Sequence, residues 1–190
     1  MIGELASSRG HTRVGSATKL RWCTPLSLFR AVHARYGFML DAAAEPASAL
    51  CPRYLSAAGR DCLVAPWALY CLPNWAGERW AWCNPPWGPR SPSFPGTRAY
   101  TRRALEQAET LTGVVLLLPT APDTIWWREL FEAASDVRLL PRIAFYDADT
   151  GVRAASPPGG GCTLFELRSS RSARTVALAD ALGNVLPERS

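Results

Sequence analysis

The chain has 190 residues, 48% of them hydrophobic, which is enough for one sizeable core and too little for two ordinary domains. No run of about 18 consecutive apolar residues occurs, and this excludes a membrane-spanning helix. The formal net charge of +5 comes with basic residues that are almost all arginine and suits a polyanionic partner, although many arginine-rich proteins bind no nucleic acid.

Residues 1–20 are small, polar and basic, and they lack the apolar stretch of a secretory signal. We expect this segment to be a flexible basic N-terminal arm and the protein to remain in the cytoplasm. Residues 21–168 are expected to form the single folded domain, and residues 169–190 a C-terminal tail.

The first predicted helix covers residues 26–36, where apolar side chains recur at helical spacing. Thr24 is suited to cap its start, and Gly37 is suited to end it. A short buried strand is predicted next, at 38–41, and it places Asp41 at its carboxyl end.

Prolines, alanines and isolated aromatic residues obscure any period between residues 45 and 77. We predict a short helix near 46–51 and irregular structure after it. The next strand is predicted at 80–83, where it leads directly into the turn Asn84–Trp87. The composition of residues 88–96 indicates a loop.

The second half of the chain alternates helices and strands. Helices are predicted at 97–110 and 123–133, and the continuous apolar run 114–118 indicates a strand covered on both faces. Further strand-like segments are 137–140, 143–146 and 162–167. A loop rich in glycine and proline would join the last two as a hairpin. The alternation predicts a three-layer α/β sheet with its chemistry at the carboxyl ends of the strands.

The turn that follows the strand at 80–83 is the most informative feature of the chain. The amide oxygen of Asn84 and the carbonyl oxygen of Pro85 can both accept hydrogen bonds, and two successive prolines stiffen the turn. Two acceptors on one amino group leave its nitrogen lone pair free to attack an electrophile, and Trp87 offers a stacking face. This arrangement suits methylation of the exocyclic amine of a nucleobase. The plainer interpretation is a strand that ends in a Pro-Pro turn.

The cysteines require a choice between disulfides, a metal site and simple packing. There are six, at positions 23, 51, 62, 71, 83 and 162, with no Cys-x-x-Cys pair and only two histidines. We interpret them as reduced, buried thiols and expect no metal. A zinc site stays open as the alternative, and it would use Cys51, Cys62, Cys71 and Cys83.

Several short motifs follow one another in a specific order, although no single one of them is specific. In chain order they are Trp22-Cys23-Thr24-Pro25, Gly37 to Ala44, Cys51-Pro52-Arg53-Tyr54, Asp61, Trp67, Asn84-Pro85-Pro86-Trp87, Gly113 to Pro119, Trp126-Trp127 and Arg142 to Phe145. Together they resemble the phage-type DNA N-6-adenine methyltransferase family, from about residue 22 to about residue 167.

The resemblance implies a fold, a reaction and an origin. The fold would be one Rossmann-like three-layer methyltransferase sheet over residues 21–168, with helices on both faces. The reaction would be methyl transfer from S-adenosylmethionine to the exocyclic N-6 amine of adenine in DNA, by a site-specific enzyme of phage or prophage origin. We make no prediction about oligomeric state.

The resemblance also implies roles for individual residues. Asn84 and the Pro85 carbonyl would bind the adenine amine, Pro86 would stiffen the turn, and Trp87 would stack on the flipped base. The chain departs from the family at Trp87, where tyrosine or phenylalanine is usual, so the base pocket must be wider or the ring tilted. The residues implied in cofactor binding are Trp22, Thr24, Pro25, Asp41, Ala42, Ala43 and Asp61.

Some of these residues also have plainer interpretations. Asp41 could cap a helix after its strand, and Asp61 could be a solvated acid in a turn. Arginines flank the loop after the turn Asn84–Trp87, which we call the acceptor turn. There they either contact DNA phosphates or form a solvated helix start. These arginines are Arg90, Arg98, Arg102 and Arg103.

Two other functions stay open at this point. The same acceptor turn could serve N-4 methylation of cytosine, although that chemistry more often pairs with serine in place of Asn84. The chain could also be a non-catalytic DNA- or cofactor-binding remnant of a prophage. No cysteine is placed as the nucleophile of a cytosine C-5 methyltransferase.

Overall fold

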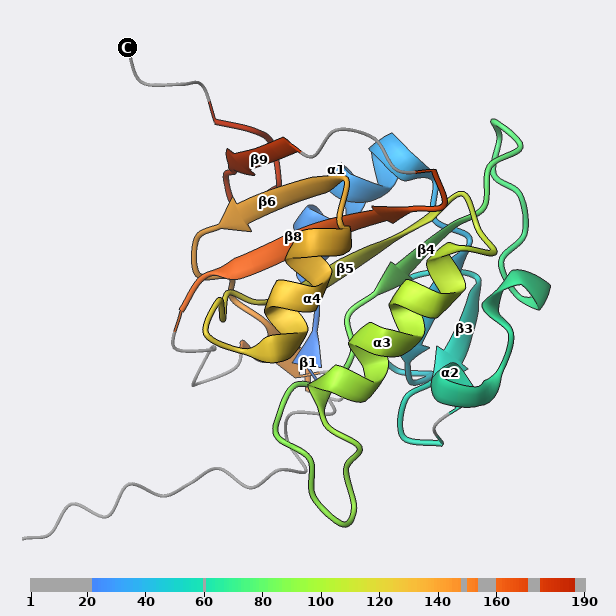
Figure 1. Cartoon of the computed structure of the whole chain (residues 1–190), viewed down its shortest axis with the longest axis horizontal. Helices are drawn as coiled ribbons and strands as arrows, with labels where there is room; N and C mark the ends of the chain where they lie inside the picture. Colours follow the sequence, from blue (N-terminus) through green and yellow to red (C-terminus); the bar gives the residue numbers. More distant parts are fainter. Residues whose placement is uncertain (1–21, 60, 148–149, 154–159, 171–174, 187–190) are drawn as a thin grey trace, which may run out of the picture.

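The computed structural model describes residues 22–59, 61–147, 150–153, 160–170 and 175–186 (Figure 1). The arm expected at residues 1–20 lies outside these ranges, and so do parts of the expected C-terminal tail. The flexibility of the arm stays a prediction.

A seven-stranded mixed sheet forms the centre of the molecule. Its strands, in spatial order, are β3 (Arg53–Ser56), β2 (Leu40–Ala44), β4 (Trp80–Cys83), β5 (Gly113–Pro119), β8 (Cys162–Arg168), β6 (Asp136–Leu140) and β9 (Thr175–Leu178). The first four are parallel, β8 is antiparallel to both of its neighbours, and β9 is parallel to β6. A separate antiparallel pair joins β1 (Trp22–Cys23) to β7 (Tyr146–Asp147).

Helices cover both faces of the sheet (Figure 1). Helix α1 (Leu26–Tyr36) packs on one face, and α3 (Thr97–Ala108) and α4 (Ile125–Ala133) pack on the other. The short helix α2 (Asp61–Val64) lies on the α3 side and is followed by the 3-10 turn η2 (Trp67–Leu69). The predicted three-layer α/β fold is confirmed.

Strand β5 shows why a sheet with two covered faces needs a continuous apolar run. Val114, Leu116 and Leu118 belong to the core under α3 and α4, whereas Val115 and Leu117 belong to the core under α1. Because successive side chains of a strand point to opposite faces, none of these five faces solvent. The prediction of a fully covered strand at 114–118 is confirmed.

The predicted helices are found close to their expected positions. Helix α1 covers 26–36 and ends at Gly37, whose left-handed backbone (φ 65°) donates its N–H to the His33 carbonyl at 2.7 Å. Helix α3 ends at Ala108 rather than 110, and α4 begins at Ile125 rather than 123.

The predictions between residues 38 and 56 were partly wrong. Strand β2 starts at Leu40 and continues to Ala44, so Asp41 lies near its start rather than at its end. The three alanines after Asp41 are buried and extend the strand, and Ala44 pairs with Ser56 of β3 after an irregularity in the register. No helix forms at 46–51, which contains only a turn. Irregular structure was expected after residue 51, but β3 forms at Arg53–Ser56.

The predicted hairpin between 143–146 and 162–167 was also wrong. Only Tyr146 of the first segment is in a strand, the short exposed β7. Strand β8 is buried along nearly its whole length and therefore takes a central place, between β5 and β6. Residues 175–178, expected in a tail, form β9 and extend the sheet beside β6.

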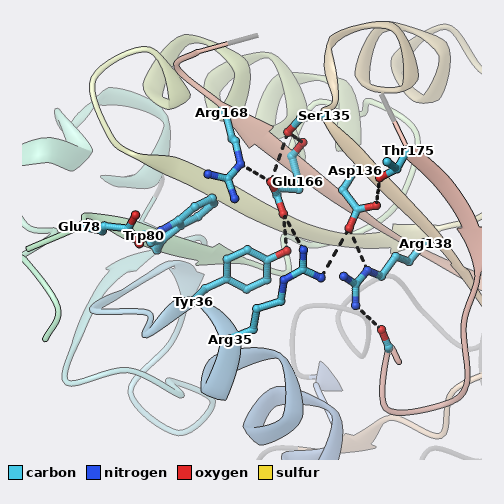
Figure 2. A network of polar contacts seen from close by, with 11 residues as sticks. Arg35, Tyr36, Glu78, Trp80, Ser135, Asp136, Arg138, Glu166, Arg168 and Thr175 are labelled. Atoms are coloured by element: carbon cyan, nitrogen blue, oxygen red, sulfur yellow. Dashed lines mark hydrogen bonds and ion pairs between the residues drawn. The ribbon is translucent and has the colours of Figure 1, made fainter. Parts of the chain in front are cut away.

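A polar network ties the end of α1 to the antiparallel part of the sheet (Figure 2). The buried carboxylate of Glu166 on β8 accepts hydrogen bonds from the hydroxyl of Tyr36 and the guanidinium of Arg168. Asp136 on β6 accepts a hydrogen bond of 2.6 Å from Thr175 at the start of β9. Burial and the adjacent carboxylate raise the pKa of Tyr36, so its hydroxyl stays a donor. The network fixes α1, β6, β8 and β9 relative to one another.

Candidate active site

The strand order reverses beside β2, because the chain leaves β2 for β3 on one side and returns to β4 on the other. Such a switch point opens a crevice at the carboxyl ends of the strands. Here the crevice is a hollow of about 550 Å³, partly open to solvent, which we call the switch-point pocket. The predicted site residues on its walls are Trp22, Thr24, Asp41, Ala43, Asn84, Pro85, Pro86 and Trp87.

Asp41 contributes a carboxyl group to the pocket wall although the residue is only 3% exposed. Its oxygens accept hydrogen bonds from the backbone N–H groups of Leu50, at 3.1 Å, and Ala43, at 3.5 Å. Burial raises the pKa of Asp41 to about 7, against the lowering effect of these two donors. The group therefore changes charge near neutrality, and a cation in the pocket would favour its ionised form.

Asn84 is oriented by a hydrogen bond from its Nδ2 to the Oγ1 of Thr24, at 3.0 Å. Thr24 is buried and stands between β1 and α1, so this bond connects the turn after β4 to the start of α1. Because the NH₂ group is engaged, the amide oxygen is the part of the side chain left to accept from a ligand. The buried Pro85 and Pro86 support the turn.

Three aromatic rings stand together at one side of the pocket. Trp87 meets Phe145 edge to face, with ring centroids 5.0 Å apart, and meets Trp22 in the same way at 6.3 Å. Trp22 and Phe145 are stacked at 6.1 Å. The edge-on contacts lock the orientation of the Trp87 ring. Phe145 ends one of the short sequence motifs, but that motif does not predict the position of its ring on the pocket wall.

Glu45, which follows β2, is a pocket residue that the sequence analysis missed. Its carboxylate accepts hydrogen bonds from the Ala58 N–H at 2.7 Å and from the Ser56 hydroxyl at 3.1 Å. These contacts join the carboxyl ends of β2 and β3. The signal available in the sequence was an acidic residue directly after three alanines, but without β3 its position could not be inferred.

Three of the expected cofactor-binding residues do not line the pocket. Pro25 stands at the N-cap of α1, and Ala42 is fully buried in the core under α3 and α4. Asp61 is exposed at the start of α2. The pocket therefore takes its walls from β1, from β2 and the residues that follow it, from the turn after β4 and from Phe145, and not from α2.

A second and wider hollow adjoins the pocket and shares Trp22 and Trp87 with it. We call it the arginine–tryptophan groove. Its charged and aromatic lining consists of Trp22, Trp87, Arg90, Arg98, Arg102 and Trp126. Three of the four arginines expected near the acceptor turn therefore lie beside the pocket.

Arg103 is the exception among these arginines. Its guanidinium donates hydrogen bonds to the backbone carbonyls of Ala65, at 2.8 Å, and Val64, at 3.3 Å, and pairs with Glu106 at 3.0 Å. Only 18% of its side chain is exposed. Arg103 thus attaches the end of α2 to α3, and it does not line the groove.

The six cysteines, all at described positions, are free thiols. Burial raises the pKa of Cys83, which directly precedes Asn84, well above its ordinary value, so it stays protonated. Within the part of the chain that the structure describes, no group of three or more His, Cys, Asp or Glu side chains could hold a metal ion. The zinc site considered from the sequence is not formed there. Nor does any described helix have the length and apolar character needed to cross a bilayer.

Comparison with known proteins identifies the family. The family model for DNA N-6-adenine-methyltransferase (Dam) matches residues 11–180. The chain belongs to this family. The matched range contains Asp41, the acceptor turn and every other wall of the switch-point pocket.

A relative within the DNA N-6-adenine-methyltransferases comes from Escherichia phage T1. It is 26% identical to this chain over 175 residues, which cover 83% of this chain and 66% of the relative. The chain thus spans slightly less than two thirds of that relative's length.

Proposed function

We propose that this protein methylates the exocyclic N-6 amine of adenine in DNA, with S-adenosylmethionine as the methyl donor. The observation that carries the proposal is the placement of Asp41 and Asn84 on one pocket, from the adjacent parallel strands β2 and β4. Membership of the DNA N-6-adenine-methyltransferase family supports the same reaction.

The donor end of the pocket fits a cationic ligand. When bound, S-adenosylmethionine supplies an electrophilic methyl group from a positively charged sulfonium. Asp41 is a buried carboxyl that has no cationic partner among the described residues, so a bound cation would stabilise its charged form. We propose that Asp41 and Ala43 hold the donor, with Trp22 and Thr24 as the opposite wall and Glu45 as a second acid.

The acceptor end of the pocket fits an amino-bearing base. The Asn84 amide oxygen and the Pro85 carbonyl would accept the two amine protons, which directs the nitrogen lone pair away from the ring plane. Trp87 supplies a stacking face whose orientation Trp22 and Phe145 fix. These residues orient the amine and exclude water, and no covalent enzyme intermediate is required. The protonated Cys83 is not suited to act as a nucleophile.

Replacing Thr24 by valine should slow methyl transfer by about five- to tenfold, because Asn84 loses the hydrogen bond that orients its amide. Thr24→Ser retains the hydroxyl and should stay close to the wild-type rate. Single-turnover kinetics at saturating donor measure this step directly. Equal rates for the valine and serine variants would show that Thr24 does not position Asn84.

Arg102 and Arg103 form a matched pair for testing contact with DNA phosphates. If Arg102 contacts a phosphate, Arg102→Gln should flatten the slope of log affinity against log salt, by about 0.9 on duplex DNA or about 0.7 on a single strand. Arg103→Gln should leave the slope unchanged and instead lower the free energy of unfolding, because its guanidinium is bound to backbone carbonyls. If Arg103→Gln flattens the slope and Arg102→Gln does not, the DNA passes on the other side of α3.

Mass spectrometry of nucleosides tests the proposed reaction. DNA is incubated with the full chain and isotopically labelled S-adenosylmethionine, then digested, and labelled N-6-methyldeoxyadenosine is the expected product. Labelled N-4-methyldeoxycytidine would instead establish the cytosine reaction. Absence of label with intact donor binding would identify a non-catalytic binding protein.

A further inference from the structure

The arginine–tryptophan groove extends well beyond the space that one base needs. Its volume is about 1770 Å³, much of it open to solvent, compared with about 550 Å³ for the switch-point pocket. Its lining residues come mainly from the loop before α3, the start of α3 and the turn before α4. None of its described lining residues is a carboxylate. The groove is therefore suited to a polyanion that continues past the pocket.

Trp126 lines the groove and has no role in the proposed methyl transfer. It lies in the first turn of α4 and is partly buried, with part of its surface packed on the core under α3 and α4. The rest of its surface lines the groove. The adjacent Trp127 is 8% exposed and fills the core, so the two neighbouring tryptophans have different surroundings. An indole held from behind by the core is a rigid platform for a flat ligand.

The arginines of the groove remain accessible to phosphate. Arg98 pairs with Glu129 at 2.5 Å, but 47% of the arginine side chain and 31% of the glutamate side chain are exposed. Exposed ion pairs of this kind contribute little to stability, so a phosphate can replace the glutamate at small cost. Arg90 has no ion pair within 4.0 Å among the described residues, and it extends the positive lining along the loop before α3.

We propose that the groove binds an unpaired DNA strand next to the target adenine, with a base stacked on Trp126 and phosphates on the arginines. This inference rests on the proposed function. In a duplex, neighbouring base pairs cover the faces of each base, so an indole in the groove could stack only on a base that has left its stack. Arginine-lined grooves with aromatic platforms are the usual way in which proteins bind single strands without reading their sequence.

The position of the groove also supports binding of an unpaired strand. Trp22 and Trp87 line both the groove and the switch-point pocket, so a strand in the groove leads directly to the acceptor turn. A target adenine that is already unpaired also avoids the cost of extrusion from a duplex, a few kcal/mol. The preferred substrate is therefore single-stranded or locally opened DNA.

A deoxyoligonucleotide with one adenine tests the inference, used as a single strand and as a duplex with its complement. Fluorescence anisotropy gives the dissociation constants, and methyl incorporation gives KM, both with the full chain. We expect both the dissociation constant and KM to be lower for the single strand than for the duplex. Trp126→Ala should raise the single-strand dissociation constant by roughly 5- to 150-fold, and Trp126→Phe much less. Trp126→Leu, which retains the core contact without a stacking face, replaces the alanine variant if that variant does not fold.

Trp75→Ala is the matched control, because Trp75 is a 72% exposed indole outside the groove. It should bind both DNAs as the wild type does. The inference is overturned if the duplex binds as tightly as the single strand, or if Trp126→Ala and Trp126→Leu bind as tightly as the control. If neither DNA is methylated but Trp126 still governs single-strand binding, the proposed function fails and the groove assignment stands.

Discussion

Replacing Asn84 by alanine is expected to reduce methyl-transfer turnover by about 10²- to 10³-fold, which is the scale of losing a polar group that acts on the reacting atoms. The dissociation constant of S-adenosylmethionine should stay within a few-fold of the wild-type value. The reason is that Asn84 presents its oxygen to the base, whereas Asp41 and Ala43 form the donor wall. Turnover and calorimetric donor binding, measured on the same preparation, separate the two effects.

Asn84→Asp is the informative control for this experiment. Its carboxylate still offers an acceptor oxygen to the base, and the Thr24 hydroxyl can donate a hydrogen bond to it where it now accepts one from Asn84. We expect Asn84→Asp to retain far more activity than the alanine variant. Comparable activity in Asn84→Ala and the wild type would remove this residue from the acceptor site.

Replacing Asp41 by asparagine should change how stability depends on pH. The folded-state pKa of about 7 lies above the ordinary value of 3.8, so the folded protein binds more protons than the unfolded chain between these values. The free energy of unfolding therefore falls as pH rises from about 4 to about 7. Asp41→Asn removes this loss and should be more stable than the wild type by roughly 2–4 kcal/mol at pH 8, with little difference at pH 4.

Urea denaturation of both proteins across this pH range measures the effect. Donor binding should respond in the opposite direction, because a cationic donor prefers the ionised carboxylate. The affinity of the wild type for S-adenosylmethionine should rise with pH up to about 7, and Asp41→Asn should bind at least about tenfold more weakly above it. An affinity independent of pH in the wild type would place Asp41 outside the donor site.

The features predicted correctly from the sequence are those set by local physics. The apolar run at 114–118 predicted a covered strand because burial on both faces leaves no position for a polar side chain. Gly37 predicted a helix end because a left-handed backbone favours glycine. The meeting of Asp41 and Asn84 followed from the rule that ligands bind at the carboxyl ends of parallel strands, even though Asp41 lies earlier in its strand than expected.

The features that were missed depend on contacts between distant segments. Strand β3 has only four residues, of which one is fully buried, so it has no periodic signal of its own and exists because β2 pairs with it. The Glu45 carboxylate on the pocket wall is held by Ser56 and Ala58, at and just after the end of β3. Phe145 lies outside any strand, and its place beside Trp87 depends on the β1–β7 pair. Arg103 looks like its neighbour Arg102 in the sequence, but α2 engages its guanidinium.

The central position of β8 has a consequence for how the chain folds during synthesis. Strands β5 and β6 are not neighbours, because β8, which follows both in the chain, is hydrogen-bonded between them. Until residue 168 has left the ribosome, both strands keep an unpaired edge of the kind that pairs with other chains. The sheet can close only through this non-local pairing, which makes folding slow and exposes the nascent chain to aggregation. A chain released early, before residue 162, would lack the strand that joins the two halves of its sheet.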